Sequence, residues 1–328
     1  MIEIAISNKS PYSNNSFSTI IILTISILFA LMVGSGLYGY GNDFYSSYYK
    51  ANLDWGGLFD RLGFILATAS INGIHLGVHI VTFILTVSAG FLIREHIKFK
   101  QSYSLVFFIL LYITAIHTWP IIMSTSNAMR QGLSMSFIFL AFVAGSRRKI
   151  YWMTIFSILA TLTHNSGIVL SSVVIFSYVV KNVLEDFSPA SKKFLNLIIG
   201  IMLLMFCFVF IKIAGLNEVG RPSKIIGGDF RGAFAFIGTL YIILSFFYKS
   251  ILANSFNLSL YYFSFVAPSL LLNELNWEYE RLGMMMLIPY ILSYGILLNR
   301  FSYQIYLLII FILLLFLTIA TGMYASFK

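Results

Sequence analysis

The sequence predicts an all-α protein that crosses a membrane many times. Of its 328 residues, 59% are hydrophobic and only 10% are charged, whereas soluble domains average about 45–50% apolar and about 25% charged residues. The apolar residues form long runs with short polar gaps between them. A helix needs roughly 20 apolar residues to cross the hydrocarbon of a bilayer. These observations exclude a soluble globular protein and favour a single polytopic domain over residues 1–328.

About eleven apolar runs are predicted to be membrane-spanning helices. Two of them are short, so the chain is expected to turn between them at membrane depth. A further run, Leu62–Ile71, is too short to cross and follows Asp60 and Arg61, so we predict an interfacial or re-entrant helix there. The predicted spans are Phe17–Tyr38, Ile74–Ile93, Ser102–Trp119, Ser126–Gly145, Ile150–Thr163, Ser166–Val180, Phe194–Ile213, Ala233–Tyr248, Phe256–Leu272, Leu282–Leu298 and Tyr303–Tyr324.

Basic residues predict the orientation of the chain. If Leu62–Ile71 does not cross and the N-terminus is cytoplasmic, the inner loops hold 12 of the 21 basic residues and 4 of the 12 acidic ones. Cytoplasmic loops of membrane proteins carry an excess of Lys and Arg. The outer face then receives three polar segments, residues 39–73, 214–232 and 273–281. The net charge of +9 is explained by the inner loops and does not indicate binding to nucleic acid.

A candidate anion site lies early in one predicted span. Asn127, Arg130 and Gln131 are spaced i, i+3, i+4, so one helix face would carry a guanidinium flanked by two amides. Arginine stays charged and donates in a planar, bidentate geometry, which suits a diphosphate. The alternative is an arginine that snorkels from the end of a helix.

A second candidate site is the polar break at residues 161–167, between two predicted helices. It contains His164 and Asn165. A histidine in this position could act as a general base or donate to a leaving phosphate. The alternative is a histidine that only fills the junction between two helices.

The outer segment 273–281 is rich in charge. If it is helical, Glu274, Glu278 and Arg281 share one face, with Glu280 nearby. A carboxylate here could activate a sugar hydroxyl while Arg281 holds an anion. The alternative is a solvated loop with salt bridges.

Two further outer segments could contact a glycan. Residues 215–232 combine five glycines with Arg221, Lys224 and Arg231, which would suit a loop that closes over a phosphate or sugar. An ordinary mobile loop explains that composition equally well.

The first outer segment carries Asp43 together with Tyr45, Tyr48 and Tyr49. These side chains suit the faces and hydroxyls of sugars, and an aromatic belt at the membrane interface is the competing explanation. The sequence predicts no metal site, because it has no His-x-x-His or carboxylate cluster and its one cysteine, Cys207, lies in an apolar run.

Taken in order along the chain, these motifs resemble those of the EpsG/Wzy family of polysaccharide repeat-unit polymerases. The resemblance extends from the first span to Leu298, and its specificity comes from the order of motifs that are each short. The matching segments are Gly41-Asn42-Asp43-Phe44-Tyr45 with Tyr48 and Tyr49, Arg130-Gln131-Gly132, His164-Asn165-Ser166, and Glu280-Arg281 before Leu282-Gly283-Met284.

The resemblance implies a GT-C glycosyltransferase of the bacterial inner membrane that uses neither nucleotide sugars nor a metal or other cofactor. Such an enzyme joins undecaprenyl-diphosphate-linked oligosaccharide units into O-antigen of lipopolysaccharide, capsule or exopolysaccharide on the periplasmic face. Its partners would be the lipid-linked donor and acceptor, membrane lipids, and the flippase and chain-length regulator of the same pathway.

Within that reaction, Arg130 and Arg281 are predicted to bind the diphosphate. For the base, His164 is the first choice because imidazole titrates near neutral pH. Glu278 or Glu280 is the second choice and Asp43 the third.

Three other functions stay open. An O-antigen ligase would act on closely related substrates. A membrane O-acyltransferase would also use an intramembrane His and Arg, but it would need an Arg-rich cytoplasmic motif, for which Arg147-Arg148-Lys149 is the one candidate. A flippase or transporter predicts pseudo-symmetric halves and charges at mid-membrane, and the sequence has neither.

Overall fold

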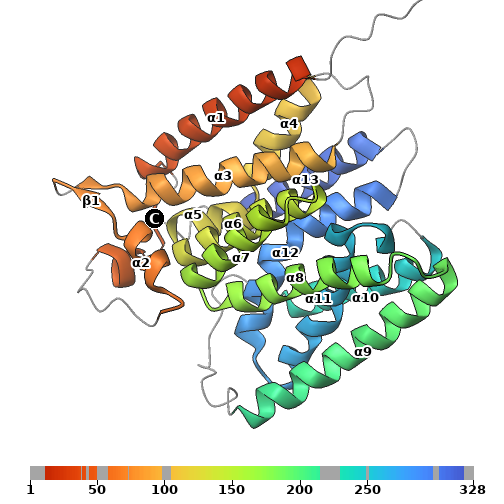
Figure 1. Cartoon of the computed structure of the whole chain (residues 1–328). Coiled ribbons are helices and arrows are strands. Elements are labelled where there is room, and N and C mark those ends of the chain that lie inside the picture. Colours follow the sequence, from red (N-terminus) through yellow and green to blue (C-terminus); the bar gives the residue numbers. More distant parts are fainter. Residues whose placement is uncertain are drawn as a thin grey trace, which may run out of the picture.

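Nearly all of the described chain is helical, as the apolar runs predict (Figure 1). The computed structural model describes residues 12–37, 39–41, 44–49, 58–72, 74–97, 105–214, 230–248, 251–297 and 303–320. The elements are α1 (Tyr12–Gly34), the π-helix η1 (Phe44–Tyr49), α2 (Arg61–Ala67), β1 (Ser70–Ile71), β2 (Ile74–His75), α3 (Gly77–His96), α4 (Leu105–Ile116), α5 (Trp119–Ser126), α6 (Met129–Ser146), α7 (Ile150–Thr163), α8 (Ser166–Val183), α9 (Pro189–Ile213), α10 (Arg231–Phe247), the 3₁₀ helix η3 (Ile251–Ala253), α11 (Ser255–Leu272), α12 (Asn276–Leu297) and α13 (Tyr303–Ala320).

Several helices are suited to a membrane, and the predicted all-α polytopic fold is confirmed. Within the described ranges, α1, α3, α8, α9 and α11 are long and apolar enough to cross, and the bent pair α4–α5 makes a sixth if it counts as one span. α9 exposes Phe194, Met202 and Phe206 along its length, as expected of a helix that faces lipid rather than water. The total of eleven spans and the GT-C arrangement stay predictions.

The predicted span Ser102–Trp119 ends a few residues early, and a short helix that the sequence did not predict follows it. α4 ends at Ile116, α5 begins at Trp119, and the two axes differ by 56°. Pro120 stands in the first turn of α5. A proline suits the start of a helix, but inside a continuous helix its ring would clash with the carbonyl of Ile116, four residues earlier. The break therefore follows from a proline at the end of an apolar run.

The segment Leu62–Ile71 is helical over only part of its length. α2 begins at Arg61 and ends at Ala67, and β1 then pairs with β2 so that Ile71 faces Ile74. Asn72 has a φ of 50°, and Asn-Gly is a favoured pair in two-residue hairpins. A helix of seven residues is about 10 Å long, which agrees with the prediction that this segment does not cross.

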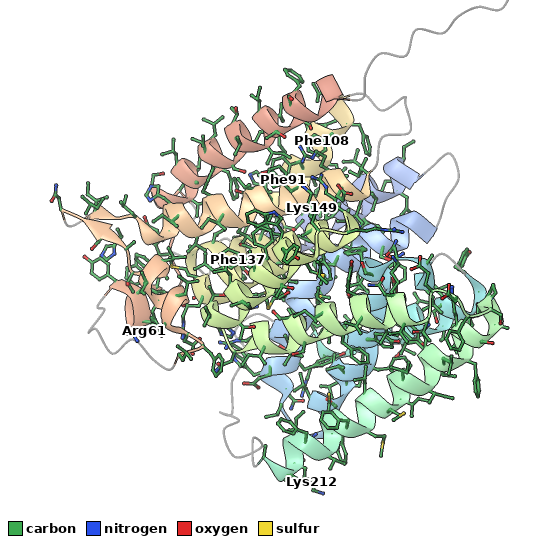
Figure 2. All side chains as sticks on the ribbon, viewed as in Figure 1. Arg61, Phe91, Phe108, Phe137, Lys149 and Lys212 are labelled. Atoms are coloured by element: carbon green, nitrogen blue, oxygen red, sulfur yellow. The ribbon has the colours of Figure 1, made fainter. Side chains whose placement is uncertain are left out.

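Two ion pairs mark the two ends of α6. At its first turn, Arg130 lies 3.2 Å from Asp60, and just beyond its last turn Arg147 lies 2.8 Å from Glu95 at the end of α3. The 18 residues of α6 separate these pairs by about 27 Å. We call the two ends of the helix bundle the Arg130 end and the Arg147 end; in Figure 2, Arg61 lies toward the former and Lys149 toward the latter.

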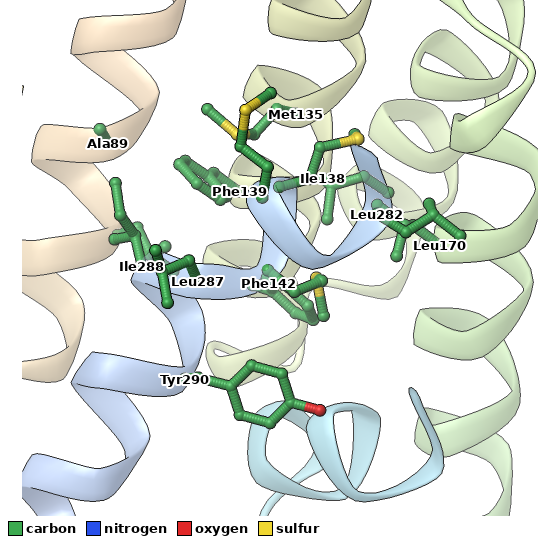
Figure 3. Close-up of a cluster of buried hydrophobic side chains, with 14 of the residues drawn as sticks. Ala89, Met135, Ile138, Phe139, Phe142, Leu170, Leu282, Leu287, Ile288 and Tyr290 are labelled. Carbon is green, nitrogen blue, oxygen red and sulfur yellow. The ribbon is translucent and has the colours of Figure 1, made fainter. Parts of the chain in front are cut away.

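The core lies where α6 meets α3, α8 and α12 (Figure 3). Polar groups inside the bundle are paired across helices: Tyr241 of α10 bonds with Ser293 of α12 at 2.6 Å, and Ser293 donates to Asn257 of α11 at 2.9 Å. Such pairing is required where no water is present. The core side chains shown include Ala89, Met135, Ile138, Phe139, Phe142, Leu170, Leu282, Leu287, Ile288 and Tyr290.

Labelling of single cysteines tests the topology. In a Cys207→Ala background, a reagent that cannot cross the membrane should modify Asn72→Cys and Asn165→Cys in intact cells, but not Arg148→Cys. Asn72 and Asn165 belong to segments at the Arg130 end, and Arg148 follows Arg147 at the other end. Protection of the Asn72 variant together with labelling of the Arg148 variant would contradict the predicted orientation.

Candidate active site

Arg130 is held by three contacts at the start of α6. Its Nη1 lies 3.2 Å from Asp60 Oδ1, and its Nε donates to the hydroxyl of Tyr48 at 3.4 Å. The guanidinium carbon lies 4.0 Å from the centroid of the Phe64 ring, a cation–π contact. The side chains of Arg130 and Asp60 are still 23% and 19% exposed. An anion can therefore reach a guanidinium that is already oriented.

Two glycines allow the surrounding segments to approach α6. A Cβ atom at Gly63 would lie 2.2 Å from the carbonyl oxygen of Thr163, so only glycine lets α2 pack on the end of α7. A Cβ atom at Gly41 would lie 2.3 Å from Oδ1 of Asn127, and the Gly41 amide donates to the carbonyl of Ser126 at 3.2 Å. These close approaches bring α2 and the segment before η1 to the Arg130 end.

His164 occupies the junction between α7 and α8. The backbone N–H of Ser166 donates to its Nδ1 at 3.1 Å, and Ser166 Oγ lies 2.7 Å from the same nitrogen. Because a backbone N–H can only donate, Nδ1 must be unprotonated, and the neutral ring carries its proton on Nε2. The histidine is thus arranged as a donor through Nε2–H.

The charge state of His164 agrees with that arrangement. Burial lowers the pKa of His164 to about 3, and the positive charges of Arg281 and Arg130 also lower it. The ring is therefore neutral at pH 7. Contacts join the three segments that carry these residues. A Cβ atom at Gly63 would lie 2.2 Å from the Thr163 carbonyl oxygen and 3.0 Å from Cγ of Arg130. Ser166 Oγ lies 3.5 Å from Sδ of Met285 in α12.

The first turns of α12 complete the site. Gln131 is 2% exposed, and its side-chain amide donates to the backbone carbonyl of Arg281 at 3.3 Å. The guanidinium carbon of Arg281 lies 4.4 Å from the centroid of the Trp277 ring. Gln131 thus fixes α12 against α6, and Trp277 supports Arg281 from within the same helix.

The two candidate glutamates differ in burial. Glu280 is 7% exposed, and its Oε1 lies 3.7 Å from Nε of Arg231 at the start of α10. Glu278, two residues earlier, is exposed. Of the two, Glu280 is the buried one, and its carboxylate faces Arg231 of α10.

The tyrosines of η1 divide between the site and the surface. Tyr48 is buried and contacts Arg130 as described, whereas Tyr45 and Tyr49 are 50% and 54% exposed. The Tyr49 ring lies 4.8 Å from that of His75, between centroids. Tyr45 and Tyr49 therefore lie at the surface of η1, the helix whose Tyr48 contacts Arg130.

Two predictions about helix faces are wrong. α6 begins at Met129, and Asn127 belongs to the turn that ends α5, so Asn127, Arg130 and Gln131 do not share one face. α12 begins at Asn276, and Glu274 precedes it with a φ of 62°, so Glu274 is not in helical register with Glu278. In both cases a turn stands where the spacing assumes a continuous helix.

The remaining predicted residues are placed as follows. Asn165 is exposed and precedes the first turn of α8. Asp43, Arg221 and Lys224 lie outside the described residues. Within the described ranges, no group of three or more His, Cys, Asp or Glu side chains could hold a metal ion.

Sequence reasoning missed Asp60, Phe64 and Ser166 as members of the site. Asp60 precedes an apolar run and was predicted only to face outward, since nothing in the sequence links it to Arg130. Ser166 follows His164-Asn165 in the matching motif, but its backbone contact with the imidazole depends on the conformation of the junction. These residues are visible in the sequence, but the sequence does not show which side chains they contact.

The fold and the site together define a polytopic membrane protein with a polar, cationic site at one end of its helix bundle. The chain belongs to the EpsG family, whose family model matches residues 15–327. No curated protein and no solved structure matches it. Membership of this family supports a role like that of a polysaccharide polymerase.

Proposed function

We propose that this protein is a Wzy-type polymerase, a GT-C glycosyltransferase that joins undecaprenyl-diphosphate-linked oligosaccharide repeat units at the periplasmic face of the bacterial inner membrane. The observation that carries the proposal is the gathering of Arg130, His164 and Arg281 at one end of the bundle from separate parts of the chain. Gly63 packs against both Thr163 and Arg130, and Gln131 donates to the carbonyl of Arg281. Two guanidinium groups and one neutral donor suit the diphosphate of a lipid-linked sugar.

In the proposed reaction, the diphosphate is the leaving group. Arg130 and Arg281 neutralise the charge that develops on it, and His164 donates a hydrogen bond from Nε2–H to one of its oxygens. Since His164 is already neutral and oriented by Ser166, it needs no proton transfer to fill this role. To act as a base through Nε2, His164 would need its proton on Nδ1. That tautomer could donate to Ser166 Oγ but would lose the hydrogen bond from the Ser166 backbone N–H.

The acceptor hydroxyl oxygen attacks the anomeric carbon, the carbon–oxygen bond to the diphosphate breaks, and a base takes the hydroxyl proton. Glu280 is our proposed base, because it is a buried carboxylate that directly precedes Arg281 in α12, whereas Glu278 is exposed. Tyr45 and Tyr49, together with Asn127 and Asn165, are proposed to contact the sugars. The same role is proposed for Asp43, Arg221, Lys224 and Arg231.

The glycan ladder of a strain that lacks the gene tests the proposal. A polymerase defect removes long chains and keeps the band of a single repeat, and expression of the wild-type protein should restore the long chains. Loss of every capped species would instead indicate a flippase or a ligase. Unchanged chain lengths with loss of acyl groups from the glycan would indicate an O-acyltransferase.

A further inference from the structure

A basic cavity of about 280 Å³ lies between the end of α8, the start of α9 and the segment that begins α11. Its lining includes Lys181, Lys192 and Lys193, with Glu185 as its acidic residue and Asn196 as a neutral polar one. None of these residues belongs to the site around Arg130. The cavity therefore needs an explanation of its own.

The three lysines outnumber the one glutamate of the lining, and none of them forms an ion pair with a carboxylate in the described part of the chain. The Lys192 ammonium donates to the backbone carbonyl of Glu185 at 2.6 Å, and that of Lys193 donates to the carbonyl of Phe246. The ion pairs of the described residues lie elsewhere, at Arg130, Arg147 and Arg231. Backbone carbonyls orient the ammonium groups without cancelling their charge, so an anion in the cavity would meet oriented cations.

Several residues that adjoin the lining residues along the chain, which we call the rim, are apolar and exposed. Val183 and Phe187 flank the α8–α9 turn, Phe194 follows on α9, and Phe247 ends α10 beside Lys193. An apolar rim around a cationic cavity matches a ligand with an anionic head and a hydrocarbon tail. A small soluble anion would use the lysines but not the rim.

The cavity and the candidate active site lie at opposite ends of α8. His164 lies two residues before Ser166, where α8 begins, and Lys181 lies in the last turn of α8. The 18 residues of α8 extend about 27 Å, close to the thickness of a bilayer core. Figure 1 shows α8 running from the α7–α8 junction toward the start of α9. If the site around Arg130 faces the periplasm, the cavity faces the cytoplasmic leaflet. Basic pockets between helices on that side bind lipid head groups.

We infer that this cavity binds the phosphate head group of an anionic phospholipid from the cytoplasmic leaflet, with the acyl chains along the exposed apolar side chains of α8 and α9. A lipid held there would join α8, α9 and the start of α11 at the end of the bundle away from the active site.

Native mass spectrometry of the purified full chain tests this inference, with phosphatidylglycerol and phosphatidylcholine of identical acyl chains as probes. We expect the wild-type protein to prefer phosphatidylglycerol. Combined Lys181→Gln, Lys192→Gln and Lys193→Gln substitutions should weaken its binding on the order of 10²-fold, at about fivefold for each lysine. Binding of phosphatidylcholine should not change.

Matched variants separate a defined cavity from a generally basic surface. Arg148→Gln with Lys149→Gln removes two charges from the Arg147 end outside the cavity and should leave binding intact, and the triple Lys→Arg variant should retain it. If the triple Gln variant does not fold, Lys181→Gln alone should still cost about fivefold. Undiminished binding by the Gln variants, an equal loss in the Arg148/Lys149 variant, or displacement of the lipid by equimolar inorganic phosphate would overturn the inference.

Discussion

Replacement of Arg130 by Lys is expected to lower turnover of purified enzyme with lipid-linked repeat units on the order of 10²–10³-fold, the usual effect of removing an oriented donor to a developing anion. The guanidinium contacts Asp60, Tyr48 and Phe64 through different parts of its plane. A lysine keeps the charge but has one ammonium group, which cannot reproduce a planar, bidentate contact with a diphosphate while it stacks on a ring.

Arg147→Lys is the matched control. Arg147 stands at the other end of α6 and also pairs with a carboxylate, since its Nε and Nη2 lie 2.9 and 2.8 Å from Glu95 Oε2. This variant should keep wild-type turnover, because its ion pair is remote from the substrate. If Arg130→Lys and Asp60→Asn lose turnover and thermal stability to the same extent, Arg130 would be a structural brace for α2 rather than a diphosphate ligand.

Most of the long helices could be predicted from the sequence because they coincide with apolar runs, whereas α5 and the π-helix Phe44–Tyr49 fall outside the predicted spans. The ends of α7, at Ile150 and Thr163, match the predicted run. Predictions failed where local backbone geometry interrupts such a run. Pro120 accounts for the break before Trp119, and close packing between helices accounts for the turn at Asn127. The hydropathy of the sequence shows neither feature.

The sequence predicts which residues belong to the candidate site, but it does not predict which of them contact one another. The topology argument placed Arg130, His164, Glu280 and Arg281 on one face, and in the structure they gather at one end of the bundle. The partner of Arg130 could not be found, because Asp60 is far away in the sequence and belongs to a short helix whose position depends on Gly63. Such pairings follow from tertiary packing, which one sequence does not reveal.

The chemical role of His164 can be separated from that of a base by two substitutions at the same position. His164→Ala is expected to lower turnover on the order of 10²–10³-fold, the cost of one missing donor. His164→Gln should recover most of this loss, because the amide N–H of glutamine can take the place of Nε2–H while the side chain has no basic nitrogen. If Gln and Ala are equally inactive, the imidazole is the base after all.

The pH dependence gives an independent measure of the same role. With its pKa lowered to about 3, folded His164 stays neutral between pH 5 and 8, so its titration should not shape the rate in that range. In the unfolded chain the ring takes up a proton below about pH 6.5. The free energy of unfolding should therefore fall as the pH drops from 6.5 toward 3, and less so in His164→Gln.

Glu280→Gln completes the assignment. If Glu280 accepts the proton of the attacking hydroxyl, the Glu280→Gln substitution should lower turnover about 10²–10⁴-fold, the typical contribution of a general base. Substrate binding should stay largely unchanged. Glu278→Gln is the matched control, because it makes the same change two residues away on an exposed side chain. Loss of turnover in the Glu278 variant alone would identify Glu278 as the base. Equal, small losses in both variants would show that neither glutamate of α12 is the base. A Glu280→Gln enzyme that also lost substrate binding would instead indicate that Glu280 acts by holding Arg231, which it faces across α10 and α12.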